Sequence, residues 1–198
     1  MAWNGTRKLW LGLGAGVVVG LVLADLWPRS PLYAVSTDRT DNLVITTVPV
    51  DESVEAIFVL DSLTGTLRGG VPSYRAKGVF QATWERNVNG DLLGYIKEFN
   101  AGLQKAAARR GGVARPELQV PQSPKYMMTS GLIDMRGVSA STRPGRSMLY
   151  VVEATSGVVL AYVVPWSAAA HSAGTVFQAP LDLWTAAPFT TAVIRSEE

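Results

Sequence analysis

A strand-and-turn pattern that occurs twice constrains the fold of this chain more than any other feature of its sequence. Residues 57–68 read IFVLDSLTGTLR, and residues 149–160 read LYVVEATSGVVL. The equivalent pairs include Phe58 with Tyr150, Val59 with Val151, Asp61 with Glu153, Thr64 with Ser156 and Gly65 with Gly157. β-Branched and aromatic residues favour strands, and glycine accepts the positive φ of many tight turns. Each copy therefore predicts a strand, a turn and a second strand.

The repeat is longer than this hairpin, because VFQA occurs at residues 79–82 and again at 176–179. We assign the two copies to residues 32–84 and 126–194. Strands are expected at residues 32–37, 43–48, 55–60, 66–71, 78–84, 126–129, 137–141, 148–153, 158–164, 176–177 and 189–194. Polar residues predict turns at 38–42 and 143–146, the latter a type II turn, and small residues predict a loop at 167–174.

An amphipathic helix is predicted between the copies, over residues 89–110. Its apolar positions are Leu92, Ile96, Phe99 and Leu103, which share one face of a helix. Glycines 111 and 112 end the helix, and the proline-rich residues 111–125 form an extended linker. We expect one helix face to pack on a sheet.

These elements predict a mainly β fold, a pseudo-twofold antiparallel sandwich or flattened barrel with one amphipathic helix. The two copies would bury facing side chains between them. The expected core residues are Phe58, Val59, Leu60, Leu149, Val151 and Val163.

The N-terminus carries a predicted transmembrane helix at residues 9–27. Residues 9–24 hold no charge, and Trp10 and Trp27 would anchor the ends of the span at the two membrane interfaces. Arg7 and Lys8 precede the span, so residues 1–8 are expected in the cytoplasm and residues 28–198 outside it. A cleaved signal peptide is the alternative, and it leaves the domain on the same side.

Three glycines in the span, Gly12, Gly16 and Gly20, form two overlapping GxxxG units. Such spacing allows close approach of a second membrane helix, although glycine is also common in membrane helices that pack on nothing. We expect this face to contact a membrane partner or a second copy.

Composition excludes several classes of function. Eighteen basic and 16 acidic residues give a net charge of +2, with no basic run suited to nucleic acid. The chain has no cysteine and one histidine, which excludes thiolate chemistry and any site that needs two imidazoles. No cofactor or metal is expected, and the polar turn at 38–42 is more simply a turn than a calcium site.

Two sets of residues could in principle be catalytic. His171 could serve a Ser-His-acid site, but it lies among small residues without a nucleophile elbow. Asp61 and Glu153 could form a carboxylate pair for glycoside cleavage. We expect instead a surface or core-edge histidine and two carboxylates that accept backbone hydrogen bonds in their turns.

Residues 58–67, FVLDSLTGTL, resemble the strand-turn-strand unit of quinoprotein-like β-propeller blades. Two such units cannot close a propeller, which needs about four to eight blades. No quinone or metal residue of that family has a counterpart here. The anchor, with VSTDR at 35–39 and VDESVEA at 50–56, is also similar to uncharacterised small bacterial membrane-anchored β-domain proteins, a resemblance that implies a location and no activity.

We therefore expect a non-catalytic accessory or structural subunit of a membrane protein complex. It would lie in a bacterial inner membrane, with its C-terminal domain in the periplasm. The expected partners are other subunits and membrane lipid, homo-oligomers are possible, and Arg143 and Arg146 are candidate partner contacts. The alternative is a membrane-anchored ligand-binding module or hydrolase acting on an envelope component.

Overall fold

A computed structural model describes residues 37–110, 116–133, 135 and 143–190. The predicted anchor, with its glycines and tryptophans, lies outside the described residues, as do the strands predicted at 137–141 and over most of 32–37 and 189–194. Residues 35–198 form one compact unit. Among the helices of the described residues, none is both long and apolar enough to cross a bilayer.

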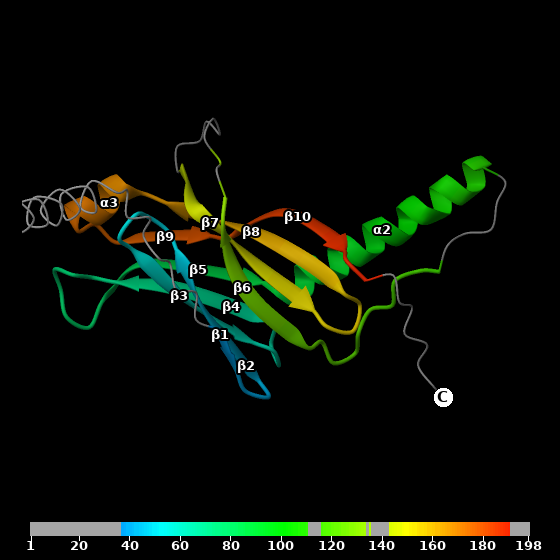
Figure 1. The fold of residues 1–198 in the computed structure, drawn as a ribbon, viewed down its shortest axis with the longest axis horizontal. Coiled ribbons are helices and arrows are strands. Elements are labelled where there is room, and N and C mark those ends of the chain that lie inside the picture. Colours follow the sequence, from blue (N-terminus) through cyan, green and yellow to red (C-terminus); the bar gives the residue numbers. More distant parts are fainter. Residues whose placement is uncertain (1–36, 111–115, 134, 136–142, 191–198) are drawn as a thin grey trace, which may run out of the picture. The chain divides into compact units, whose positions relative to one another are not determined.

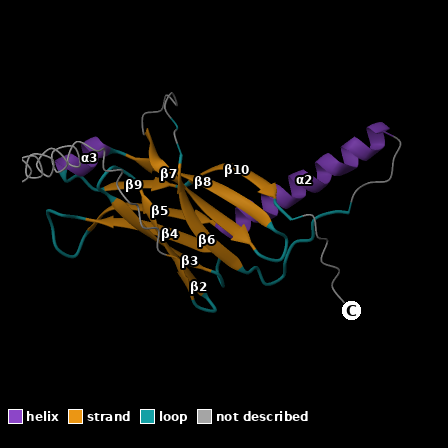
Figure 2. Cartoon of the chain, in the orientation of Figure 1, coloured by secondary structure: helices purple, strands orange, loops and turns teal. Residues whose placement is uncertain are grey.

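Two β-sheets and one long helix make up this unit (Figures 1 and 2). In chain order the elements are β1 (Thr37–Arg39), β2 (Leu43–Pro49), β3 (Glu55–Asp61), β4 (Thr66–Pro72), β5 (Phe80–Asn87), α2 (Val88–Arg110), β6 (Tyr126–Leu132), β7 (Arg143–Glu153), β8 (Val158–Trp166), α3 (Ala168–Ala173), β9 (Phe177–Pro180) and β10 (Asp182–Pro188). We call β1-β2-β3-β4-β5-β9 sheet A and β10-β8-β7-β6 sheet B. The mainly β, sandwich-like prediction is confirmed.

The two copies of the repeat form the central hairpins of the two sheets. In sheet A, Phe58 pairs with Gly69 and Leu60 with Leu67. The equivalent pairs of sheet B are Tyr150 with Ala161 and Val152 with Val159. Gly65 and Gly157 close the turns with φ of 69° and 66°. The predicted hairpins therefore form in the same register.

The strand after each hairpin differs between the copies. β5 runs straight along β4, but its counterpart bends at the buried Leu181 and divides into β9 and β10. β9 pairs with β5 in parallel, so that the two VFQA segments lie beside each other in sheet A, and β10 pairs with β8 in sheet B. A strand that changes sheets in this way joins the two layers at one side.

The two hairpins bury opposite faces. Phe58 and Leu60 are wholly buried in the main core, whereas their equivalents Tyr150 and Val152 are only partly buried and lie on the outer side of sheet B. Conversely, Val151 is wholly buried and its equivalent Val59 is not. The two copies therefore do not bury the same face, as the predicted pseudo-twofold would require.

Four of the six predicted core residues, Phe58, Leu60, Leu149 and Val151, lie in the main core. Val59 was wrong, because it alternates to the outer face of sheet A. Val163 is buried, but with Met148 and Ala161 in a second small cluster on the outer side of sheet B, where Ile133 and Met135 pack.

Three local predictions were also wrong. Residues 143–146 begin β7 with an irregular register, and Gly145 and Arg146 lie against the backbone of Val50. Residues 167–174 contain the helix α3, which Ser167 caps and Gly174 ends in the left-handed conformation. β10 was missed, since its two alanines and Pro188 are not typical of a strand.

The predicted helix is confirmed as α2. Its first half is held by Val88, Leu92 and Ile96, which are buried in the main core. Its second half extends beyond the sheets (Figure 1), where Asn100 exchanges two hydrogen bonds of 2.9 Å with the backbone of Leu118. The helix is thus anchored at its start and projects at its end.

Candidate functional site

The two candidate carboxylates serve their own turns. Asp61 accepts hydrogen bonds from the backbone N–H of Leu63 at 2.9 Å and the hydroxyl of Thr64 at 3.0 Å. These hydrogen bonds lower the pKa of Asp61. The expectation that Asp61 acts as a turn acceptor is confirmed.

Glu153 performs the same task inside the protein. Its wholly buried carboxylate accepts from the backbone N–H and hydroxyl of Ser156 at 2.6 and 2.7 Å, and from the backbone N–H groups of Thr155 and Lys125 at 3.0 and 3.1 Å. Burial alone would raise the pKa of Glu153, but these bonds lower it below its ordinary value. Such a carboxylate is stable as an anion and is occupied by protein donors, which does not suit a general acid or a nucleophile.

A polar network closes the sandwich where α2 begins. The guanidinium of Arg86, on β5, forms two hydrogen bonds of 2.7 Å to the carboxylate of Asp91, in the first turn of α2. The buried hydroxyl of Tyr162 donates to the same carboxylate at 3.0 Å. Hydrogen bonding to Asp91 raises the pKa of Arg86, and burial raises the pKa of Tyr162.

Tyr126, at the start of β6, adds a second contact to the start of α2. Its hydroxyl donates to the side-chain oxygen of Asn89, and burial raises its pKa. Asn89 in turn fills the space beside Gly65, at the turn of the first hairpin. The network therefore ties the start of α2 to both sheets, and its groups are paired with one another, as in a structural cluster.

His171 lies at a different part of the fold, on α3. Its ring is 5.3 Å from the ring of Tyr74 and 5.1 Å from that of Trp166. Arg75 covers Tyr74 and donates to the backbone oxygens of Ser172 and Ala173, at the end of α3. His171 is half-buried at the core edge, as expected, and no described serine donates to its ring nitrogens.

The candidate partner arginines lie near the start of β7. Arg146 is exposed and forms a 3.0 Å ion pair with Glu52. The backbone of Arg143 pairs with Trp166 in β8, and its side chain lies outside the described atoms. No group of three His, Asp or Glu suited to a metal ion occurs in the part of the chain that the structure describes.

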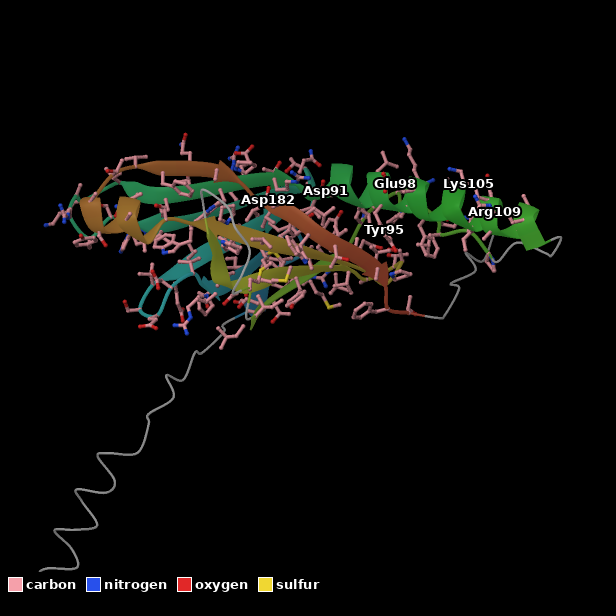
Figure 3. All side chains as sticks on the ribbon, turned by 90° about the horizontal axis from the view of Figure 1, so that it is seen from above. Asp91, Tyr95, Glu98, Lys105, Arg109 and Asp182 are labelled. Atoms are coloured by element: carbon pink, nitrogen blue, oxygen red, sulfur yellow. The ribbon has the colours of Figure 1, made fainter. Side chains whose placement is uncertain are left out.

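α2 carries one row of side chains along its length, which is partly buried at Asp91 and Tyr95 and exposed from Glu98 onward. Asp91, Tyr95, Glu98, Lys105 and Arg109 follow one another from the sheets to the far end (Figure 3). The acidic residues lie toward the start and the basic residues toward the end, which matches the helix dipole. This charge order stabilises the helix and by itself indicates no ligand.

The outer side of sheet B is the feature that sequence reasoning missed. Five apolar residues are exposed or half-buried there: Met127, Tyr150, Val152, Val159 and Ala187. On that side, residues 148–152 of β7 and 158–163 of β8 carry no charge. The signal was present in β8, which reads VVLAYVVPW without the polar alternation of a half-exposed strand.

The structure thus brings Asp91, Arg86 and Tyr162 together, and it uses Asp61, Glu153 and His171 in separate structural roles.

Comparison with known proteins identifies no relative: no protein-family model, curated protein or solved structure matches the chain.

Proposed function

We propose that this protein is a non-catalytic structural subunit of a membrane protein complex. In this proposal residues 9–27 hold the chain in a bacterial inner membrane, and the β domain contributes binding surfaces on the periplasmic side. The partners are other subunits of the complex, which contact the membrane helix and the β domain.

The observation that carries this proposal is the apolar outer side of sheet B. A strand that faces water on one side normally alternates apolar and polar residues. β7 and β8 instead carry apolar residues on both sides. A sheet face that is apolar along two neighbouring strands avoids the free-energy cost of exposure to water when it contacts a partner.

The alternative of a hydrolase or ligand-binding module receives no such support. Its candidate groups were Asp61, Glu153 and His171. Asp61 accepts two hydrogen bonds within its own turn, Glu153 accepts four from its turn and from Lys125, and the ring of His171 lies at a tilt against those of Tyr74 and Trp166. None of these groups is presented to a substrate with a second catalytic partner.

The proposal is tested by isolating the full-length chain from its native membranes in mild detergent and weighing the complex. We expect a particle heavier than a 21.2 kDa chain in its micelle, with polypeptides in fixed ratio. Met127→Lys, which charges the outer side of sheet B, should reduce the mass. Leu93→Lys should leave the mass unchanged, because Leu93 is exposed to a similar extent but lies on α2 and not on sheet B. A chain that is always isolated alone contradicts the proposal.

Topology is tested separately. The chain lacks cysteine, so Leu63→Cys places a single thiol at a position that is 73% exposed in the first hairpin turn. We expect a membrane-impermeant maleimide to label this thiol from the periplasmic side of intact cells. Labelling only after the inner membrane is broken would contradict the proposed location.

A further inference from the structure

The inversion of the two hairpins gives sheet B an outer side that is apolar along β7 and β8. We call this side the B-outer face. Its apolar members are Met127, Met148, Tyr150, Val152, Val159, Ala161, Val163 and Ala187. Ile133 and Met135 already cover Met148, Ala161 and Val163, and the strand register also places Thr129, Thr185 and Asp182 on this side. In the hairpin, its members are equivalent to the residues with which sheet A faces the core: Ala56, Phe58, Leu60, Leu67, Gly69 and Val71.

The same relation holds for the outer side of sheet A. We call this side the A-outer face, and its large apolar members are Leu43, Ile45, Ile57, Val59 and Phe80. Ile57 and Val59 are equivalent to Leu149 and Val151, with which sheet B faces the core. Phe80 lies over Gly70 on this side, where a larger residue would collide with its ring.

Within one chain, the core forms where the inner face of sheet A packs on the inner face of sheet B. By the repeat, the B-outer face matches the first of these surfaces along both strands of the hairpin. The A-outer face matches the second along β3, whereas β4 carries Thr66, Arg68 and Gly70 where β8 has the buried Val158, Leu160 and Tyr162. The two outer faces are therefore related to each other as the two inner faces are. They lie on different sheets, so one molecule cannot bring its own outer faces together.

We propose that the A-outer face of one copy packs on the B-outer face of a second copy, so that the chain associates head to tail with itself. The contact repeats between molecules the pairing of faces that builds the core within each one. This inference goes beyond the proposed function and does not depend on the membrane anchor.

Charged residues lie around the apolar centre of each face. The B-outer face carries no charge along β7 and β8, and Asp182 lies beside Val163 on the edge strand β10. On the A-outer face Ile45, Val59 and Ile57 are adjacent on paired strands, with Asp38, Glu55 and Asp61 around them. Arg68 occupies the place equivalent to the buried Leu160, but it is paired with Glu85 at 2.9 Å and both side chains are exposed. Arg68 pairs with Val59 across β3 and β4, so this ion pair limits the contact to β2 and β3 and stays in water beside it.

A contact between two different faces does not close on itself. Each copy in a chain of copies has one free face of each kind, so that association continues as concentration rises. A symmetric dimer through the B-outer face would stop at two copies. The two arrangements therefore differ in how mass depends on concentration and in which substitutions break it.

The test uses the full-length chain in detergent, with mass measured by light scattering over a concentration series. Ile57→Lys blocks the A-outer face, and Met127→Lys blocks the B-outer face; these side chains are 41% and 46% exposed, so both variants should fold. Val152→Lys provides a second block of the B-outer face. Leu93→Lys, on α2, is the matched control. All variants keep the same anchor, so any association through residues 9–27 is equal in each.

We expect the mass of the unaltered chain and of Leu93→Lys to rise with concentration, and each blocked variant to need at least about ten times more protein for the same mass, which is a tenfold loss of affinity. An equal mixture of Ile57→Lys and Met127→Lys should form a one-to-one pair, because each retains the face that the other lacks. The inference is overturned if the unaltered chain associates no more than the blocked variants, if only one of the two faces matters, or if the mixture forms no pairs. Other polypeptides in fixed ratio without self-association would overturn it and leave the proposed function standing.

Discussion

Phe58 and Tyr150 occupy equivalent places in the two copies of the repeat, yet Phe58 is wholly buried between the sheets and Tyr150 lies on the outer side of sheet B. Both rings lie opposite a small residue, Gly69 and Ala161 respectively. The same local pairing thus supports the core in one copy and an outer surface in the other.

This difference predicts unequal costs for equivalent substitutions. Phe58→Ala should lower the free energy of unfolding by about 3–5 kcal/mol, because it leaves a cavity beside Trp84, whose ring stacks on Phe58 at 5.7 Å. Tyr150→Ala should cost about 1–2 kcal/mol, since its site is open on one side. Urea unfolding measures both values, and equal losses would contradict the assignment of faces.

The two equivalent turn carboxylates should also differ. Glu153→Ala leaves four donors without their acceptor, three of them backbone N–H groups, in a buried turn, and we expect a loss of about 3–5 kcal/mol. Asp61→Ala removes hydrogen bonds that water can replace, so its effect on the unfolding free energy should be much smaller. A larger loss for Asp61→Ala than for Glu153→Ala would argue against this account.

Acid should destabilise the fold through these same groups. The pKa values of Glu153 and Asp61 are lowered in the folded state, so the unfolded chain binds their protons first as pH falls. Their contribution is complete above the unfolded pKa and is lost from about pH 5 downward, through the lowered values. Glu153→Gln should reduce the slope of unfolding free energy against pH below about pH 5. An unchanged slope would show that Glu153 does not titrate in this way.

Asp91 should be the most sensitive polar residue of α2. Asp91→Ala leaves the guanidinium of Arg86 and the buried hydroxyl of Tyr162 without their acceptor, at a cost of about 3–5 kcal/mol. Arg68→Ala breaks an exposed ion pair and should cost at most about 1 kcal/mol. Thermal unfolding of the two variants checks the comparison, and similar losses would mean that the network at the start of α2 is not a stabilising unit.

Two glycines should respond in opposite directions to alanine. Gly157 has a φ of 66° and lies against the side chain of Thr190, so Gly157→Ala should cost about 1–3 kcal/mol. Gly94, on α2, has open space where a Cβ would lie, so Gly94→Ala should stabilise the protein by about 0.5–1 kcal/mol. Chemical unfolding distinguishes the signs, and a stabilising Gly157→Ala would contradict the turn geometry.

Local signals allowed much of the fold to be predicted from the sequence. The turn glycines placed both hairpins, and the spacing of Leu92, Ile96 and Phe99 placed α2. What the sequence did not show was which face of each hairpin is buried. Strands 148–153 and 158–164 are apolar on both sides, so alternation gives no preference, and only the packing of whole sheets decides.

The division of β9 from β10 was hidden for a similar reason. The chain bends at Leu181, which is not a turn-forming residue. Pro180 is the one residue in the sequence that indicates the end of a strand there. For the candidate site, turn chemistry correctly predicted the roles of Asp61 and Glu153. The network joins Arg86 and Asp91, which are five residues apart across the start of α2, to Tyr162, which is 71 residues beyond Asp91, so no local spacing rule could assemble it.

Cross-linking between introduced cysteines tests most directly the claim that the two outer faces pair between copies. The chain has no cysteine of its own, so Ile57→Cys and Val152→Cys can be combined in one full-length chain and treated with a short thiol-specific cross-linker. We predict a ladder of dimers, trimers and longer products from the double variant, and only dimers from an equal mixture of the two single variants. Dimers formed as readily by Val152→Cys alone, or no products from the mixture, would contradict head-to-tail association.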